Sequence, residues 1–343
     1  MPLTTTGELI TRAAAAHTAV AAFNVITLEH VEAVVAGAES VGAPVVLQVS
    51  ENAVKFRGGE LLPLARAASA AAEHATVPVA LHLDHIQSDD LLRRAPDAGF
   101  SSVMYDASRL PYRENLAATR AAVEWAHGQG LWIEAELGRV GGKEAARVGG
   151  KEAARVGGKE AARVGGKEVA RVGGKEAARV GGGNGVPSLD AHAPGARTDP
   201  DEARAFVAES GVDALAVAIG SSHAMTTRTA ALDHTLLKRL TAALDVPLVL
   251  HGSSGVPDDE LRAAVAGGIA KVNIGTALNI ALTGAIREHL AARPDVVDPR
   301  KYLTVGRAAM VETVARLIGV LRTDDPCRVH EKRRSGAECD GRH

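Results

Sequence analysis

Three histidines that lie far apart in the sequence each follow an apolar run typical of a buried strand. His85 closes VALHLDH, His223 follows AVAIGSS and His251 follows PLVL. A single histidine at a strand end is usually a hydrogen-bonded structural residue, but three on different strands can converge in space. Neutral imidazoles from three directions suit a divalent transition metal with an open coordination position, as in catalytic zinc sites. The sequence therefore predicts a metal site with the Asp84 carboxylate beside it.

The apolar runs that must position these histidines alternate with longer Ala-rich segments that have helical patterns. This alternation indicates a parallel α/β fold, and eight strand–helix units close a (β/α)8 TIM barrel. A doubly wound open sheet is the alternative, but it requires a glycine-rich turn after the first strand, and FNVITLEH is not one. Helices are expected to start at Thr198-Asp199-Pro200 and at the first-turn prolines Pro111 and Pro257. The predicted strands are 19–25, 44–50, 77–85, 101–107, 131–137, 213–220, 246–252 and 269–275.

In a TIM barrel, the C-terminal ends of the strands meet at the catalytic face. Two glycine-containing stretches, HGSSG at 251–255 and NIGT at 273–276, follow the last two predicted strands and precede helices. Backbone N–H groups of small residues and helix N-termini attract phosphate, and these loops are its usual location in such barrels. A phosphorylated substrate is therefore expected. Further polar residues at strand ends are Asn24, Ser50, Asp106, Glu136 and Asn273.

The overall composition is that of an ordinary globular protein. The formal net charge of −2 over 343 residues gives no indication of nucleic-acid or membrane binding. No apolar run reaches the ~18 residues of a membrane span, and the first residues lack the pattern of a signal peptide. The two cysteines, Cys327 and Cys339, both lie near the end of the sequence, so a disulfide framework is excluded. These features predict a cytoplasmic protein.

An octapeptide, RVGGKEAA, repeats with little change through residues 139–182. A period of eight does not match a coiled coil, and each copy carries a Gly-Gly pair and one apolar valine. We interpret the repeats as a low-complexity insertion in the loop after the fifth strand. The expected organisation is one barrel over residues 1–321, interrupted by this insertion, followed by a charged tail at 322–343 that is predicted to be disordered.

In combination, these motifs resemble the class II, zinc-dependent ketose-bisphosphate aldolases, the family that holds fructose- and tagatose-bisphosphate aldolases. The resemblance covers nearly all of residues 1–320 apart from the repeats. It is carried by AFNV at 22–25, HLDH at 82–85, SVMYDAS at 102–108, EAELGRVGG at 134–142, VDALAVAIGSSH at 212–223, PLVLHGSSG at 247–255, KVNIGT at 271–276 and DPRKYL at 298–303.

The resemblance implies a zinc ion held by His85, His223 and His251, with Glu136 at the metal site. Asp84 would be the general acid–base that exchanges a proton with the C4 hydroxyl of the substrate. Glu144 would be the second acid–base, which protonates the enediolate left after C3–C4 cleavage. Glu144 keeps the family's spacing from Glu136, but the same local context recurs at Glu152, Glu160, Glu168 and Glu176.

The same resemblance implies a substrate pocket and its lining. Asn24 and Ser50 would line the pocket. The backbone N–H of Ala224 stands where relatives have a phosphate-binding glycine, and alanine restricts the backbone there. Other departures from the family pattern are Ala145, Thr226 and Gly275, which are Asp, Tyr and Asp in many or several relatives. The dihydroxyacetone phosphate moiety would contact Gly252, Ser254, Asn273, Gly275 and Thr276.

The implied function is reversible cleavage of a ketose 1,6-bisphosphate, of the fructose or tagatose type, to dihydroxyacetone phosphate and glyceraldehyde 3-phosphate by a homodimer or homotetramer. Two alternatives remain among enzymes: a Schiff-base aldolase that uses Lys271, and a metal-dependent hydrolase. Lys271 has inward parity with Asn273 and could instead be ion-paired inside the barrel. A third alternative is a sugar-phosphate-binding barrel that has lost its activity.

Overall fold

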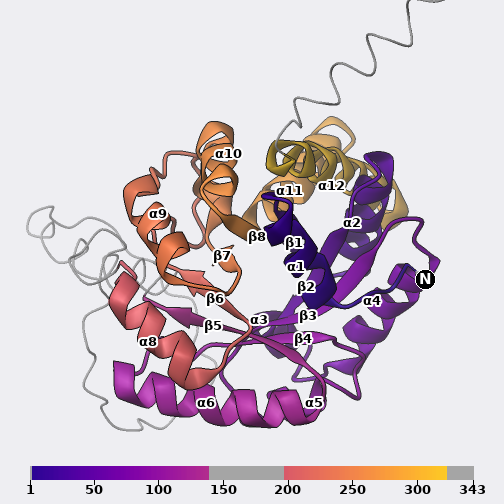
Figure 1. Ribbon diagram of the computed structural model, residues 1–343. Coiled ribbons are helices and arrows are strands. Elements are labelled where there is room, and N and C mark those ends of the chain that lie inside the picture. Colours follow the sequence, from indigo (N-terminus) through magenta and orange to yellow (C-terminus); the bar gives the residue numbers. More distant parts are fainter. Residues whose placement is uncertain (1, 139–196, 323–343) are drawn as a thin grey trace, which may run out of the picture.

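Eight parallel strands form a closed barrel in sequence order, and β1 pairs with both β2 and β8 (Figure 1). The structure is a computed structural model that describes residues 2–138 and 197–322. The predicted (β/α)8 TIM barrel is thus confirmed, and each strand lies within its predicted range except β3, which extends one residue further. The strands are β1 Val20–Asn24, β2 Val45–Ser50, β3 Val79–Ile86, β4 Ser102–Tyr105, β5 Trp132–Leu137, β6 Ala214–Val217, β7 Leu248–Leu250 and β8 Ile269–Ile274.

Helices surround the barrel, and the three predicted helix starts lie within one residue of observed ones. Asp199 caps α8 by accepting hydrogen bonds from the N–H groups of Asp201 and Glu202. Pro111 and Pro257 have extended ψ values of 151° and 156°, so each precedes its helix and the first-turn prediction was wrong by one residue. The helices are α1 Thr6–Ala15, α2 Leu28–Ser40, α3 Glu51–Phe56, α4 Leu62–His74, α5 Asp89–Arg94, α6 Tyr112–Gly128, α8 Pro200–Ser210, α9 His234–Ala243, α10 Asp258–Ala266, α11 Thr276–Ala292 and α12 Pro299–Leu321, with a 3₁₀ turn, η1, at Ser253–Gly255.

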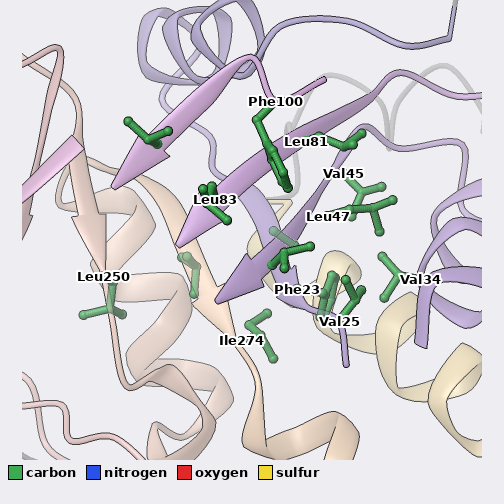
Figure 2. Packing of buried hydrophobic residues seen from close by; sticks show 14 of the residues in the cluster. Phe23, Val25, Val34, Val45, Leu47, Leu81, Leu83, Phe100, Leu250 and Ile274 are labelled. Atoms are coloured by element: carbon green, nitrogen blue, oxygen red, sulfur yellow. The ribbon is translucent and has the colours of Figure 1, made fainter. Parts of the chain in front are cut away.

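Alternate strand residues pack into separate apolar clusters because successive side chains point to opposite faces. The outward-pointing ones, including Phe23, Leu47 and Leu83, pack against the helices in one large cluster (Figure 2). A smaller cluster inside the barrel packs against α1, which closes the end where the strands begin (Figure 1). Its strand residues are small or β-branched: Val20, Ala22, Val46, Ala80 and Ala270. The opposite end of the barrel, where the strands finish, holds the polar residues.

None of the helices within residues 2–138 and 197–322 has both the length and the hydropathy required of a transmembrane segment. The predicted insertion at 139–182 and nearly all of the predicted tail lie outside the described residues. The expectations about both segments therefore stay predictions.

Candidate active site

His85, Glu136, His223 and His251 converge at the C-terminal end of the barrel. One ligand atom from each lies within 4.8 Å of the others, although the residues come from β3, β5, the loop after β6 and the end of β7. The rings of His85 and His251 are 4.8 Å apart between centroids, and those of His85 and His223 are 5.1 Å apart. Three imidazoles and one carboxylate form a donor set typical of zinc. The predicted residues therefore meet in one site that could hold such an ion.

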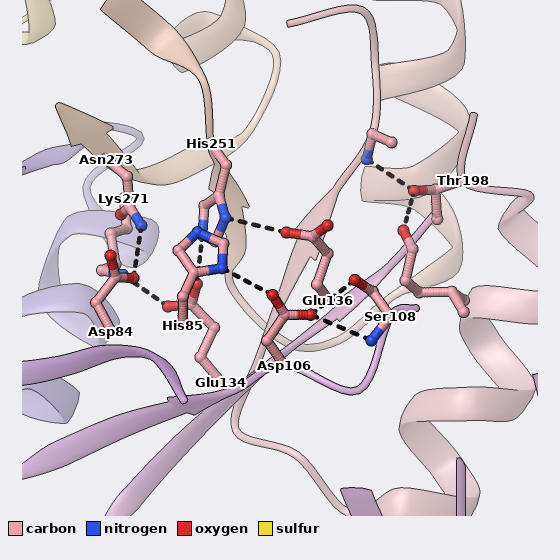
Figure 3. A network of polar contacts seen from close by, with 12 residues as sticks. Asp84, His85, Asp106, Ser108, Glu134, Glu136, Thr198, His251, Lys271 and Asn273 are labelled. Carbon is pink, nitrogen blue, oxygen red and sulfur yellow. Dashed lines mark hydrogen bonds and ion pairs between the residues drawn. The ribbon is translucent and has the colours of Figure 1, made fainter. Parts of the chain in front are cut away.

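A local distortion of β3 brings Asp84 and His85 to the same side of the strand. The pairing with β4 shifts register between Leu83 and Ile86, and His85 has a left-handed backbone with φ of 50°. In a regular strand these neighbours would point to opposite faces, but a bulge of this kind redirects one side chain. As a result, the carboxylate of Asp84 and the imidazole of His85 both reach the site (Figure 3).

Asp106, at the end of β4, orients the ring of His85. Nδ1 of His85 lies 3.0 Å from Oδ2 of Asp106, while Oδ1 of Asp106 accepts hydrogen bonds from the backbone N–H and the hydroxyl of Ser108. Burial alone would raise the pKa of Asp106, but its hydrogen bonds with His85 and Ser108 outweigh this and lower it. With the Nδ1 proton donated to an ionised carboxylate, Nε2 of His85 keeps its lone pair for a metal.

His251 lies between two glutamates of β5 and is completely buried. Its Nε2 is 2.8 Å from Oε1 of Glu134, and its Nδ1 is 3.1 Å from Oε2 of Glu136. Burial lowers the pKa of His251, but the carboxylates of Glu134 and Glu136 outweigh it and raise the pKa. Nδ1 is buried and its contact with the Glu136 carboxylate does not have good hydrogen-bond geometry. A cation between Nδ1 and the Glu136 carboxylate would provide that nitrogen with a partner, so the residues fit a bound metal.

Without a metal, the three rings differ sharply in proton affinity. Burial alone would lower the pKa of His85. The neighbouring carboxylates of Asp84 and Asp106 outweigh this effect and raise the pKa to about 10. For His223, burial and the neighbouring His85 lower the pKa to about 3. Because a metal ion needs neutral imidazoles, it must displace the proton held by His85.

Asp84 is held by two amides, one from β1 and one from β8. The Nδ2 group of Asn24 donates to Oδ2 over 2.8 Å, and that of Asn273 donates to Oδ1 over 3.3 Å. Burial raises the pKa of Asp84, but the adjacent His85 and His251 outweigh it and lower the pKa. Asp84 is therefore an ionised carboxylate next to the clustered histidines. Both asparagines were predicted to contact substrate, and here they also position this carboxylate.

The loops after β7 and β8 lie side by side. Gly252 has φ of 67°, and a Cβ there would lie 2.7 Å from the backbone of Ser222, so only glycine fits. The hydroxyl of Ser254 accepts a hydrogen bond from the N–H of Ala277, in the first turn of α11. Gly275 and Thr276 form the start of α11. The predicted phosphate site thus has the expected helix N-terminus and small residues, and phosphate binding itself stays a prediction.

Ser50 is in register with Asp84 on the neighbouring strand. Its hydroxyl caps α3 by accepting a hydrogen bond from the N–H of Ala53 over 3.2 Å. Ser50 therefore has a structural role, and its pocket role stays a prediction. Glu144 and the alternatives Glu152, Glu160, Glu168 and Glu176 lie outside the described residues, so the second acid–base stays a prediction.

Lys271 is completely buried inside the barrel and does not reach the surface of the site. Its Nζ lies 2.7 Å from Oε2 of Glu134 (Figure 3). A Schiff-base lysine must offer a neutral amine to a carbonyl of the substrate. An amine enclosed in an ion pair meets neither requirement, so the geometry supports the ion-paired role of Lys271.

Two residues that orient the histidines, Asp106 and Glu134, were not among the predicted site residues. Asp106 was noted as a strand end, but its partner depends on the bulge in β3. Glu134 has the same parity as Glu136, and Lys271 has the same parity as Asn273. Alternation along β5 therefore indicated that a second glutamate faces the barrel interior, where it needs a cationic partner.

Residues 4–325 match the family model described as fructose-bisphosphate aldolase class-II. The chain is 36% identical over 324 residues to a protein of Bacillus subtilis strain 168 described as a probable fructose-bisphosphate aldolase, covering 94% of this chain and 97% of that protein. It is 35% identical over 323 residues to the fructose-bisphosphate aldolase of Geobacillus stearothermophilus, covering 94% and 96%. The solved structure of the YdjI aldolase from Escherichia coli K12 matches with a TM-score of 0.71 and 28% identity, covering 94% of this chain and 98% of that one.

Ala224, the residue after His223, has φ of 61°, in the left-handed region that alanine disfavours by about 1–2 kcal/mol. We expect Ala224→Gly to raise the free energy of unfolding by about 1 kcal/mol and the thermal midpoint by roughly 2 °C. Thermal unfolding in EDTA measures this effect without a contribution from bound metal. The control is Ala121→Gly on the exposed face of α6, which should be destabilising by about 1 kcal/mol. A loss of stability in both variants would contradict the expected strain.

Proposed function

The chain belongs to the class II fructose-bisphosphate aldolase family and is an aldolase of the lyase class, and we propose that it is zinc-dependent and cleaves a ketose 1,6-bisphosphate of the fructose or tagatose type to dihydroxyacetone phosphate and glyceraldehyde 3-phosphate. One observation carries the proposal. The ligand atoms of His85, Glu136, His223 and His251 lie within 4.8 Å of one another, beside the buried, ionised carboxylate of Asp84.

Zinc bound by the three histidines, with Glu136 next to it, would supply Lewis-acid stabilisation of the negative charge that develops on the C2 oxygen. Asp84 accepts the proton of the C4 hydroxyl, the C4–O bond becomes a carbonyl, and the electron pair of the breaking C3–C4 bond moves to C3. Asn24 and Asn273 hold the carboxylate for this transfer through their hydrogen bonds to its two oxygens. The aldehyde is thereby released.

A second group must protonate C3 to complete dihydroxyacetone phosphate, and we assign this step to Glu144. The phosphate of that product would bind to the loops after β7 and β8, at backbone N–H groups near Gly252, Ser254, Gly275 and Thr276. The backbone N–H of Ala224 would contact the same phosphate. Ser50, in register with Asp84 on the neighbouring strand β2, would contact the part of the substrate beyond C4. A phosphate anchored at one end and Asp84 near the middle together define which bond breaks.

The proposal includes a homodimer or homotetramer located in the cytoplasm. The absence of a cysteine before Cys327 supports a reducing compartment. Light scattering coupled to size-exclusion chromatography tests the subunit number, and a monomeric mass at micromolar concentration would refute that part of the proposal.

We expect the purified protein to cleave fructose 1,6-bisphosphate or tagatose 1,6-bisphosphate, measured by enzymatic detection of dihydroxyacetone phosphate. Activity should be lost in EDTA and restored by Zn²⁺, because the C2 oxygen then lacks its Lewis acid. EDTA already saturated with zinc is the matched control. Turnover that resists EDTA would favour an imine mechanism at Lys271. A zinc-loaded protein that binds both sugars without turnover would identify a binding barrel instead.

Asp84→Asn should lower kcat by about 10²- to 10⁴-fold because an amide cannot accept the C4 hydroxyl proton. The zinc content per subunit, measured by atomic absorption, should stay unchanged since Asp84 is not one of the clustered ligands. Asp97→Asn, at an exposed position in the turn after α5, is the matched control and should keep full activity. Near-normal kcat in Asp84→Asn would exclude Asp84 as the base.

A further inference from the structure

A row of polar side chains crosses the interior of the barrel, a region that barrels of this kind usually fill with apolar residues. His82, Glu134 and Lys271 are all completely buried there. Lys271 Nζ lies 2.7 Å from Oε2 of Glu134 and 3.5 Å from Nε2 of His82. The row begins at Thr6 of α1, which accepts a hydrogen bond from Ser102, and Ser102 contacts Nδ1 of His82 over 2.7 Å.

Stability alone does not account for a buried ion pair. Desolvation of an ammonium and a carboxylate can exceed their mutual attraction, and replacing such pairs by apolar residues is often neutral or stabilising. In this barrel the pair lies directly behind a predicted metal ligand, because the other oxygen of Glu134 contacts Nε2 of His251 over 2.8 Å. The pair therefore acts on His251, and its function must be sought there.

The hydrogen bonds of Glu134 decide which nitrogen of His251 carries a proton. Lys271 has only donors, so it occupies one carboxylate oxygen as an acceptor. The remaining oxygen can only accept as well, and Nε2 of His251 must therefore be the donor. Nδ1 is left with a lone pair, and it faces Glu136 and the other ligands.

The tautomer of His85 is fixed in the same way, but there the opposite nitrogen keeps the lone pair. Its Nδ1 contacts Asp106, which leaves Nε2 for the metal. Both ligands thus depend on a carboxylate behind them, but only the carboxylate behind His251 has a buried cation as its second partner. Such supporting carboxylates fix the tautomer and the orientation of metal-bound histidines.

We propose that Lys271 and Glu134 are positioning residues that fix His251 in the tautomer whose Nδ1 binds the metal. The inference rests on the metal site of the proposed function. His82 completes the arrangement: burial and the nearby Lys271 lower its pKa to about 3, so its neutral ring can accept from Lys271 while it donates to Ser102. The row of polar residues thereby holds the ammonium in place from the closed end of the barrel.

Glu134→Gln tests the proposal because an amide has one acceptor and one donor end. Lys271 would take the amide oxygen, so the amide NH₂ would face Nε2 of His251. The ring would then have to accept at Nε2 and carry its proton on Nδ1, where the metal should bind. An analogous carboxylate-to-amide change in a serine protease triad acts through the wrong tautomer. We expect the Kd for Zn²⁺, measured by competition with a chelator, to rise about 10- to 100-fold.

The double variant Glu134→Gln/Lys271→Met should reverse this loss. Without the ammonium, the amide can rotate its oxygen toward His251 and accept from Nε2, so the Kd should return to within about threefold of wild type. Lys271→Met alone keeps an acceptor toward His251. It should therefore change the Kd less than Glu134→Gln does and should mainly lower the thermal midpoint in EDTA, because it leaves a buried carboxylate without its cation. If Glu134 and Lys271 only stabilised the fold, the order of zinc affinities would be reversed and the double variant would bind zinc most weakly.

Glu51→Gln is the matched control, since Glu51 is also a buried carboxylate with two donors, Lys55 Nζ and the N–H of Gln87. It contacts none of the clustered ligands, and its Kd for zinc should equal that of wild type. The proposal is wrong if Glu134→Gln binds zinc as tightly as wild type, or if the double variant binds no better than Glu134→Gln.

A measurement on the wild type keeps the proposal testable if a variant does not fold. In zinc-loaded protein labelled with ¹⁵N-histidine, NMR should detect the ring proton of His251 on Nε2 and that of His85 on Nδ1. The reverse assignment for His251 would overturn the proposal. Wild-type protein that binds no zinc would instead refute the metal site itself, and the tautomer inference with it, so the two failures are distinguishable.

Discussion

The left-handed backbone of His85 is the constraint on which the rest of the site depends. A regular β3 could present Asp84 or His85 to the barrel mouth, but not both, because successive side chains alternate. The register shift against β4 removes this conflict and places the Asp84 carboxylate and the His85 imidazole next to each other. A non-glycine residue with positive φ is unfavourable by itself. The hydrogen bond to Asp106 and the packing against His223 and His251 stabilise it here.

The orientation of the imidazoles is a second requirement of the site. Carboxylates on the side of the rings away from the cluster meet it. Asp106 supports His85 and Glu134 supports His251, each through the nitrogen that faces away from the cluster. Carboxylates in such positions carry negative charge into buried surroundings, where each needs donors. Ser108 supplies them to Asp106 from the solvent side of the barrel end, whereas Lys271 supplies one to Glu134 from the interior. The proposed role of Glu134 and Lys271 thus gives the polar interior of this barrel a function in the site at its mouth.

The sequence was sufficient to predict the barrel, its strands and the meeting of the three histidines. The strands are mostly apolar runs, and a closed barrel brings any strand ends together, so His85, His223 and His251 could be placed without knowledge of distances. The roles of Asp106 and Glu134 could not be predicted in the same way. They depend on a one-residue bulge and on which nitrogen of a ring faces inward, and neither leaves a signal in local composition or periodicity. For the same reason, Ala224 could be identified as a departure, but its left-handed backbone became apparent only in the structure.

The ligands are also distributed so that no local segment can form the site. The sequence separations between His85, Glu136, His223 and His251 are all larger than a helix or hairpin can bridge, and the ligand atoms meet only when β3, β5, β6 and β7 are in register. A metal that binds this cluster binds the closed barrel and not the unfolded chain. Its binding free energy therefore adds to the stability of the barrel, by RT ln(1 + [metal]/Kd). Because the ligands come together only in the closed barrel, a tighter metal site would also stabilise the closed barrel more when metal is present.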